Sequence, residues 1–225
     1  MAAVWFIVSN GQTKLYVNGA IAQQNRGALK IMLILVRHGR TIANAQALLQ
    51  GHVNHPLDEI GVDQARRVAR VLNDLYPKAR VISSPLLRAR QTAETISTSV
   101  FIDERFIELN YGDFDELALT DVSPEIWEQW RSDENFRPPQ GETLHELDIR
   151  VHAALQDLSA EARTQDVIVV THVSPIKSAM TWALGGDASM SWRCTLDRAS
   201  ITRVAIGPRG PSLTGFNDTA HLQEK

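Results

Sequence analysis

The stretch Leu33-Ile34-Leu35-Val36-Arg37-His38-Gly39-Arg40 (LILVRHGR, 33–40) decides the fold of this chain. Four apolar residues that favour β structure end abruptly at Arg-His-Gly, which predicts a buried strand with His38 at its carboxyl end. Ligands bind at that end of the strands in open parallel sheets. Residues 41–44 then predict the start of a helix, whose free N–H groups suit a phosphate. We therefore expect an anion site around His38, with Arg37 and Arg40 beside it.

A second strand-to-helix junction follows the same plan further along the chain. The apolar run 166–171 ends directly at His172. Ser174 and Pro175 come next and predict a helix, with the serine as N-cap and the proline as first helical residue. This junction would bring a second histidine to the same edge of the sheet.

A third junction supplies an arginine. Residues 81–83 predict a short strand, and Ser84-Pro85 predicts a helix start that places Arg88 in the first turn. Arg-His-Gly by itself occurs by chance and is weak as a motif. Three strand ends that offer His, His and Arg favour one anion pocket over three unrelated coincidences.

Six segments of the chain, taken in order, resemble those of the histidine phosphatase superfamily, which includes the phosphoglycerate mutases. They are LVRHGRTIAN (35–44), LDEIGVDQA (57–65), SSPLLRARQTAETI (83–96), ELNYGDF (108–114), PPQGET (138–143) and VTHVSP (170–175). The ordered set covers nearly all of residues 32–206 and is highly specific. Within the superfamily, the segments 172–177 and 196–201 look similar to short, broad-specificity or α-ribazole-type phosphatases of actinobacteria.

The resemblance implies roles for five residues. His38 is the expected nucleophile, which accepts the phosphoryl group as phosphohistidine. Arg37, Arg88 and His172 are expected to clamp the phosphoryl oxygens, because guanidinium forks suit their geometry. Glu108 is the expected general acid, which protonates the leaving oxygen and then activates water.

Four further residues complete the expected binding site. By the same resemblance, Asn44 adds a neutral donor, Gln50-Gly51 brings a backbone N–H near the phosphate, and Val173 lies in the same region. Composition alone would make Glu108 a solvated surface residue before a turn, because most glutamates are exposed. Its position within the ordered motifs is what favours a catalytic role.

The chain departs from the usual pattern of the family at two places. Arg40 stands where glutamate or glutamine is common, and it adds positive charge near the pocket mouth. Val173 stands where glycine is usual and is followed by Ser174-Pro175. A β-branched residue does not easily adopt positive φ, so we expect an ordinary backbone conformation there.

Three functions remain open at this stage. The favoured one is a phosphohydrolase that acts on a small phosphate monoester. The alternatives are a phosphoglycerate mutase-type phosphotransferase and a catalytically silent phosphate-binding module. All five expected catalytic residues are present, which favours an enzyme. Between Glu108 and the segment 138–143 only one helix is expected, around Trp127, so water should reach the phosphohistidine and favour hydrolysis over transfer.

Composition agrees with such an enzyme. The 225 residues carry a formal net charge of −3 and show no basic stripe with aromatics, so nucleic acid is not an expected partner. A single cysteine, Cys194, excludes an intrachain disulfide and fits a reducing compartment, and no apolar run has the length of a membrane span. We expect a cytoplasmic protein whose partner is a small phosphorylated metabolite, and a homodimer stays open.

No cofactor or metal is expected. His52 and His55 are the best-spaced histidine pair, but no carboxylate or thiol cluster accompanies them. The proposed chemistry needs no metal, since arginine and histidine would supply the positive charge.

Alternating β and α signals predict an α/β fold, a three-layer α/β/α sandwich with a mostly parallel central sheet and a small lid insertion. Residues 1–31 are expected to be an N-terminal extension, and residues 32–225 a single domain with its lid at about 103–140. In the lid, Trp127 and Trp130 share one helical face, which suits packing on the sheet or cover over the pocket. In the extension, Val4–Val8 and Lys14–Val17 could form a hairpin through Asn10-Gly11. The expected strands and helices lie near 33–36, 80–83, 100–102, 166–171 and 201–206, and near 41–47, 61–75, 85–98, 142–162 and 174–184.

Overall fold

The computed structural model describes residues 4–9, 12–17, 20–21 and 31–223 and divides the chain into two units, Met1–Lys30 and Ile31–Lys225. The first unit holds a three-stranded antiparallel sheet of β1 (Val4–Ser9), β2 (Gln12–Val17) and β3 (Ala20–Ile21). The pairing of β1 with β2 confirms the predicted hairpin, whose turn residues 10–11 lie outside the described part.

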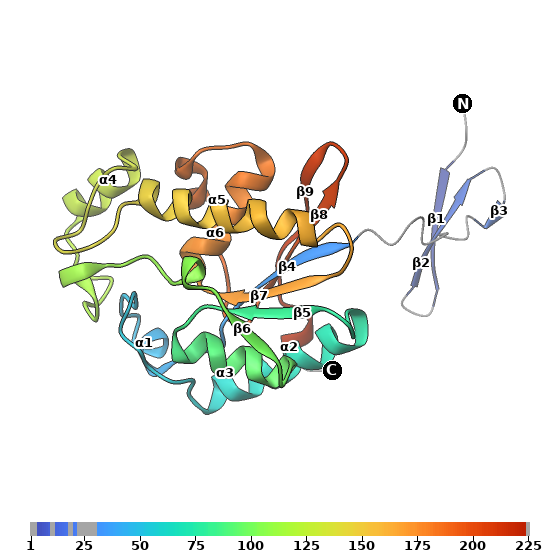
Figure 1. Ribbon diagram of the computed structural model, residues 1–225, viewed down its shortest axis with the longest axis horizontal. Helices are drawn as coiled ribbons and strands as arrows, with labels where there is room; N and C mark the ends of the chain where they lie inside the picture. The colour runs from blue at the N-terminus through green and yellow to red at the C-terminus, as the bar shows by residue number, and fades with distance from the viewer. Residues whose placement is uncertain (1–3, 10–11, 18–19, 22–30, 224–225) are drawn as a thin grey trace. The chain divides into compact units, whose positions relative to one another are not determined.

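A six-stranded sheet forms the centre of the second unit, in the order β6-β5-β7-β4-β8-β9 (Figure 1). Four strands run parallel, namely β4 (Met32–Arg37), β5 (Arg80–Ser83), β6 (Val100–Ile102) and β7 (Val167–Thr171). The other two, β8 (Ile201–Gly207) and β9 (Gly210–Asp218), are antiparallel and extend the sheet beyond β4. The mostly parallel sheet is therefore confirmed, with an antiparallel edge.

The strand β9 was not predicted. It begins with Gly210 and Pro211 and contains Gly215, and these residue types are depleted in strands. Proline is tolerated in sheets at an edge or at the start of a strand, where its missing N–H costs nothing. β9 occupies such an edge, so its place in the sheet depends on pairing with β8 rather than on its own propensity.

Helices cover both faces of this sheet, which gives the predicted three layers (Figure 1). The helices α2 (Glu59–Leu75) and α3 (Leu87–Ile96) lie on one face, and α5 (Leu144–Glu161) and α6 (Val173–Leu184) lie on the other. Successive side chains of β4 alternate between two cores. Leu33 and Leu35 belong to the core shared with α5 and α6, while Ile34 and Val36 belong to the core shared with α2 and α3.

The helices α6 and α3 do not begin at the Ser-Pro pairs that were predicted to start them. α6 begins at Val173 with His172 as N-cap, not with Ser174 as N-cap. The reason is that the carboxylate of Glu108 accepts from the N–H groups of Val173 and Ser174 and so takes the place of a local cap. As expected, Val173 has no positive φ. α3 begins at Leu87, two residues after Pro85.

The remaining segments are short. The helix α1 (Ile42–Ala45) begins in a capping box of Thr41 and Asn44, and the others are α4 (Pro124–Ser132), η1 (Glu104–Phe106), η2 (Gly112–Phe114), η3 (Ala188–Arg193) and η4 (Ala220–Leu222). Within the described ranges, no helix combines the length and the apolar character that a membrane crossing requires.

The expected lid contains α4, the helix predicted around Trp127, which begins at Pro124 with Ser123 as N-cap. The ring of Trp130 is 1% exposed and stacks on Trp127, with 5.6 Å between centroids and 14° between planes. Trp192 of η3 meets both rings edge-on. These contacts fix α4 against η3, so Trp130 packs in the core while Trp127 stays half-buried beside the cavity described below.

Candidate active site

The carboxyl ends of three adjacent parallel strands meet at the site. In the register of the sheet, Arg37 at the end of β4 pairs with Thr171 at the end of β7, and Ser83 of β5 pairs with Val170 of β7. His38 and His172 therefore leave neighbouring strands at the same level. Their ring centroids lie 5.1 Å apart, so the edge predicted from the sequence does bring the two histidines together.

His38 is held in one orientation by two hydrogen bonds. Its Nδ1 lies 2.7 Å from the carbonyl oxygen of Gly39, and its Nε2 lies 3.3 Å from Nε of Arg88. A carbonyl can only accept and a guanidinium can only donate, so the neutral ring carries its proton on Nδ1. Burial, with Arg88 and Arg37 nearby, lowers the pKa of His38 well below its ordinary value. Nε2 thus presents a lone pair at neutral pH.

The turn that carries His38 is packed directly on α2. A Cβ atom added to Gly39 would lie 2.4 Å from the carbonyl oxygen of Gly61, far inside van der Waals contact. A Cβ atom at Gly61 would in turn meet the carbonyl oxygen of Arg40. The backbone after His38 can approach α2 this closely because both positions lack a side chain.

Arg88 is completely buried and is held by the loop that follows α1. Its NH1 donates to the carbonyl of Val53 at 2.9 Å, and its NH2 donates to those of Gly51 at 2.8 Å and Gln50 at 3.2 Å. Burial lowers the pKa of Arg88 to about 10, so the guanidinium keeps its charge at neutral pH. The charge is thereby fixed beside His38 Nε2.

Arg37 and Arg198 form the other cationic side of the site. NH1 of Arg37 donates to the carbonyl of Leu196, and NH2 of Arg198 donates to that of Asn44 at 2.9 Å. Burial and the neighbouring Arg198 lower the pKa of Arg37 to about 10. Sequence reasoning did not assign Arg198 to the site, because it lies in the loop before an antiparallel strand and not at a parallel strand end.

His172 is buried beside His38. Its Nε2 lies 2.7 Å from the hydroxyl oxygen of Ser84, which follows β5. Burial, followed by the charge of Arg88, lowers the pKa of His172 well below its ordinary value. Both histidines of the site are therefore neutral rings at neutral pH.

Glu108 is 3% exposed and points at the N-terminus of α6. Its Oε2 accepts from the N–H of Val173 at 3.1 Å, and its Oε1 accepts from the N–H of Ser174 at 3.2 Å and of Leu109 at 2.8 Å. Three backbone donors hold the carboxylate in place, and no side chain among the described residues donates to it. This contact with α6 explains why Glu108 occupies the site, although the residues around it in the sequence do not by themselves indicate a site.

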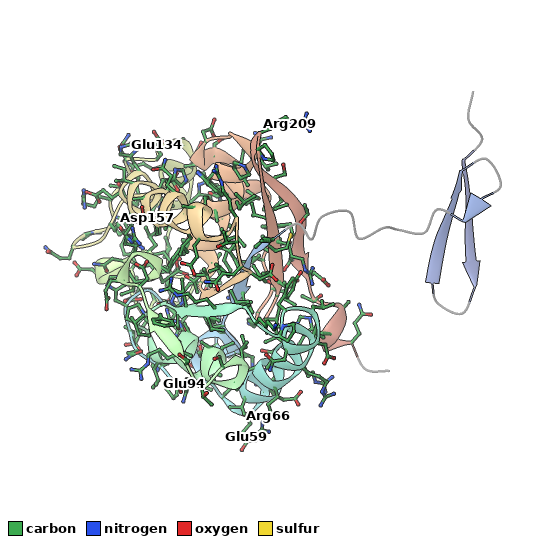
Figure 2. All side chains as sticks on the ribbon, turned by 45° about the vertical axis from the view of Figure 1, so that its right-hand side comes forward. Glu59, Arg66, Glu94, Glu134, Asp157 and Arg209 are labelled. Carbon is green, nitrogen blue, oxygen red and sulfur yellow. The ribbon has the colours of Figure 1, made fainter. Side chains whose placement is uncertain are left out.

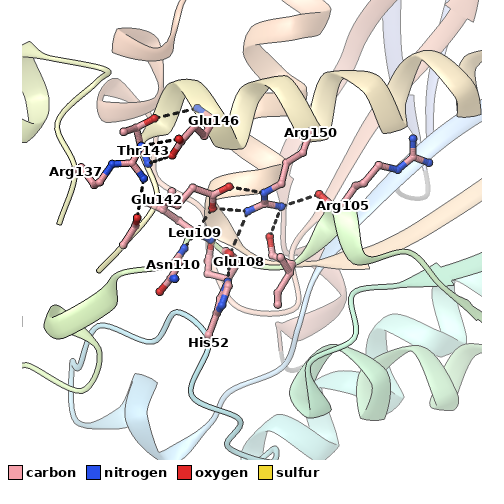
Figure 3. A network of polar contacts seen from close by, with 12 residues as sticks. His52, Arg105, Glu108, Leu109, Asn110, Arg137, Glu142, Thr143, Glu146 and Arg150 are labelled. Carbon is pink, nitrogen blue, oxygen red and sulfur yellow. Dashed lines mark hydrogen bonds and ion pairs between the residues drawn. The ribbon is translucent and has the colours of Figure 1, made fainter. Parts of the chain in front are cut away.

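A polar network holds the backbone of Glu108 (Figure 3). Arg150 of α5 donates through NH2 to the carbonyl of Glu108 at 3.2 Å and forms an ion pair with Glu142, with Nε 2.7 Å from Oε1. Nε2 of His52 lies 3.0 Å from the same carbonyl. Sequence reasoning missed Arg150, since an arginine in the middle of an amphipathic helix suggests a solvated face.

The other expected binding residues, Asn44, Gln50 and Gly51, form hydrogen bonds mainly with neighbouring protein groups. The Oε1 of Gln50 accepts from Thr41 Oγ1 at 2.8 Å and from Asn44 Nδ2 at 3.4 Å. The N–H of Gly51 donates to Asp115, so its carbonyl and not its N–H faces the site, where it binds Arg88. Asn44 and Gln50 both line the cavity of the site.

Arg40, expected near the pocket mouth, forms an ion pair with Asp58, 2.8 Å from Nε to Oδ2, and does not line the cavity. His52 and His55, weighed as metal ligands, contact the carbonyl of Glu108 and the carboxylate of Glu116. Among the residues that the structure describes, no group of three or more metal-ligating side chains lies together.

A cavity of about 430 Å³ opens from this cluster. Its polar lining includes Arg37, His38, Asn44, Gln50, Glu108 and Arg198. The rest of its lining is mainly apolar and aromatic, with a few polar groups, and includes Leu48, Leu119, Trp127, Leu144, Leu147, Asp148, Lys177 and Trp192. The cavity therefore suits a molecule with an anionic head and a larger remainder.

Comparison with known proteins agrees with this geometry. Residues 33–219 match the model of the histidine phosphatase superfamily (branch 1). The chain is 34% identical over 207 residues to a probable phosphoglycerate mutase, GpmB, of Yersinia pestis, covering 85% of this chain and 95% of the relative. It is 32% identical over 198 residues to the bifunctional protein Rv2228c of Mycobacterium tuberculosis. That match covers 84% of this chain, and the chain spans about half (54%) of the length of the relative.

Solved structures give the same result. A phosphoserine phosphatase from Entamoeba histolytica, in complex with phosphoserine, has a TM-score of 0.78 at 26% identity, covering 85% of this chain and 99% of that one. A putative α-ribazole-5′-P phosphatase from Escherichia coli has a TM-score of 0.73 at 26% identity, covering 84% and 97%. The resemblance inferred from the sequence is thereby confirmed.

Proposed function

Because the chain belongs to the histidine phosphatase superfamily, branch 1, we propose that it hydrolyses a small phosphate monoester. The phosphoryl group passes first to His38 and then to water, and Glu108 serves as general acid and general base. Membership of this family, with phosphatases and a probable mutase among the similar proteins, supports phosphatase-type or mutase-type chemistry. We propose in addition that the reaction is hydrolysis and that His38 and Glu108 have the roles given above.

The observation that carries the proposal is a set of buried nitrogens without partners. Arg37 Nε, Gln50 Nε2, His172 Nδ1 and Arg198 Nε find no hydrogen-bond partner among the described residues. A buried polar nitrogen left unpaired costs about 1–3 kcal/mol, so four of them around one histidine need an explanation. The arginine and glutamine nitrogens are donors, and a phosphoryl group with three acceptor oxygens and negative charge would satisfy them.

In the first half-reaction, the lone pair on His38 Nε2 attacks phosphorus. The P–N bond forms as the bond from phosphorus to the ester oxygen breaks, and Glu108 gives a proton to the departing oxygen. Arg37 and Arg88 stabilise the charge on the phosphoryl oxygens. Arg88 Nε, which lies 3.3 Å from Nε2 in the free site, would exchange that contact for an oxygen of the phosphoryl group.

In the second half-reaction, water replaces the alcohol. Glu108, now a carboxylate, takes a proton from the water as its oxygen bonds to phosphorus. The P–N bond breaks and returns its electron pair to His38 Nε2, which leaves inorganic phosphate and the starting enzyme. The three backbone donors to Glu108 hold its carboxyl group in one place through both steps.

The second candidate is a phosphoglycerate mutase-type transferase, favoured by the 34% identity to GpmB. A mutase keeps water from the phosphohistidine until the phosphoryl group returns to a substrate oxygen. In this chain only α4 and the 3₁₀ helix η2 lie between Glu108 and Gly141, which is little cover over the site. Hydrolysis is therefore the favoured outcome.

A panel of phosphate esters tests the proposal. We expect inorganic phosphate to be released from p-nitrophenyl phosphate with and without chelator, and from at least one member of a panel that includes α-ribazole phosphate, phosphoserine and sugar phosphates. Interconversion of 2- and 3-phosphoglycerate, primed with 2,3-bisphosphoglycerate and with little phosphate released, would establish the mutase instead. Phosphate binding without turnover of any ester would establish a silent binding module.

A further inference from the structure

Lys177 lies on the wall of the cavity that also contains Arg37, His38 and Glu108. It belongs to α6, four residues after Val173, whose N–H binds Glu108. Residues four apart lie on the same face of an α-helix, about 6 Å along its axis. A substrate whose phosphoryl group lies at His38 would therefore extend into the same cavity that Lys177 lines, about one helical turn from the contact between Glu108 and α6.

The amine of Lys177 stands out among the cations of the described residues. Outside the three arginines of the site, every other arginine or lysine within residues 31–223 either forms an ion pair or is exposed, as Figure 2 shows for Arg66 and Arg209. Lys177 is half-buried, and no described carboxylate lies within 4.0 Å of its amine. Burial lowers its pKa, which is the cost of a partly desolvated charge without a partner.

Asp148 of α5 is another charged residue of the cavity lining, and it does not neutralise the lysine. Its carboxylate lies 4.0 Å from Nε2 of His152 and forms no ion pair with Lys177. A salt bridge within the protein therefore does not account for a lysine at this position. A charge left unpaired on the wall of a ligand cavity is instead compensated when a ligand brings the opposite charge.

We propose that Lys177 determines specificity by binding a second anionic group, a carboxylate or a second phosphate, on the alcohol portion of the substrate. The inference rests on the proposed phosphatase function and narrows its substrate class. The phosphoryl group sits between Arg37, Arg88 and His38, the ester oxygen faces Glu108, and the second anion reaches Lys177. The natural substrate is then a phosphate monoester with at least two anionic centres.

Matched pairs of esters test this assignment. 3-Phosphoglycerate and glycerol 3-phosphate share one carbon skeleton and differ by a carboxylate in place of a hydroxymethyl group. Fructose 1,6-bisphosphate and fructose 6-phosphate provide the corresponding pair for a second phosphate. We expect the wild-type protein to prefer the doubly anionic member of one pair in kcat/KM, and the pair that responds identifies which anion is bound.

The variant Lys177→Met should reduce that preference about 10-fold to 100-fold, the range of a charge-assisted hydrogen bond, mainly through KM. Lys177→Arg keeps the charge and should retain most of the preference. Lys78→Met removes an exposed lysine from the turn before β5 and should leave the ratio as in wild type. No preference in either pair, or a ratio that Lys177→Met does not change, would overturn the assignment.

The same comparison can be made without turnover. Calorimetric titration of the His38→Ala protein with each member of a pair gives a ratio of dissociation constants, which Lys177→Met in the same background should reduce by a similar factor. If no ester is hydrolysed but this ratio falls, the proposed phosphatase function fails while the role of Lys177 stands. If phosphate is released but the ratio does not respond, the role of Lys177 fails alone.

Discussion

The Nε of Arg88 lies 3.3 Å from the Nε2 of His38, so one guanidinium contacts the nitrogen from which the proposed reaction starts. The other nitrogens of Arg88 are held by carbonyl groups of residues 50–53. The same side chain therefore orients the imidazole, carries charge into the site and fixes the loop after α1. These three effects depend on the planar fork and not on charge alone.

Arg88→Lys should accordingly behave as a severe substitution. A lysine keeps the charge but cannot contact His38 and the carbonyls of the loop together. We expect kcat/KM for p-nitrophenyl phosphate to fall about 100-fold to 1,000-fold, as when a preorganised charge donor is lost. Arg90→Lys, two residues along α3 and exposed, is the matched control. A loss of less than about threefold would show that charge alone suffices.

His38→Ala tests the nucleophile. Removal of a covalent nucleophile should lower kcat by about four orders of magnitude. With ³²P-labelled substrate, rapid quenching in alkali should trap label on the wild-type protein, since phosphohistidine is stable in alkali and lost in acid, and none on the variant. Circular dichroism would check that the fold survives. Activity above about one per cent of wild type would rule out His38 as nucleophile.

Glu108→Gln tests the proton donor. The amide can still accept hydrogen bonds from the backbone near α6 but cannot give up a proton to the leaving oxygen. We expect a much larger loss of kcat/KM for alkyl phosphates than for p-nitrophenyl phosphate, because nitrophenolate departs without protonation. Equal losses for the two ester types would assign Glu108 a purely structural role.

The two site histidines should also make stability depend on pH. Their pKa values lie well below 6.5 in the folded protein. As the pH falls below 6.5, these two side chains therefore take up protons in the unfolded chain but not in the folded protein. The free energy of unfolding should therefore decrease below that pH, by about 1 kcal/mol per pH unit for each histidine. Urea titrations at pH 7.5, 6.5 and 5.5 measure this slope. His38→Asn should flatten it, and an unchanged slope would contradict a neutral, buried His38.

The sequence predicted the parts of the site that come from parallel strand ends. His38 and His172 follow runs of buried apolar residues, and Arg88 follows the short strand at 81–83. The ends of these predicted strands place the three residues at one edge of the sheet. Glu108 was expected only from its resemblance to a family motif. The structure supplies the missing physical reason, which is the contact with the N-terminus of α6.

Residues that reach the site from elsewhere left no such signal. Arg198 comes from the loop before an antiparallel strand, and Arg150 lies in the middle of an amphipathic helix. The edge strand β9 was missed because its glycines and proline disfavour a strand until β8 offers a partner. The start of α6 was displaced because the distant carboxylate of Glu108 replaces the local cap. In each case a long-range contact overrode the local preference.

The wall of the cavity made by α4 and η3 has a different origin from the floor that holds His38. The floor is built by strand ends and by glycines that tolerate no side chain, whereas the wall is joined through the packed rings of Trp127, Trp130 and Trp192. Under the proposed mechanism, substitutions in the wall leave the reacting groups in place, and those in the floor do not. We therefore expect the chain to be evolvable: directed evolution confined to the outer residues of α4 and η3 should exchange one ester for another while the reaction at His38 is kept.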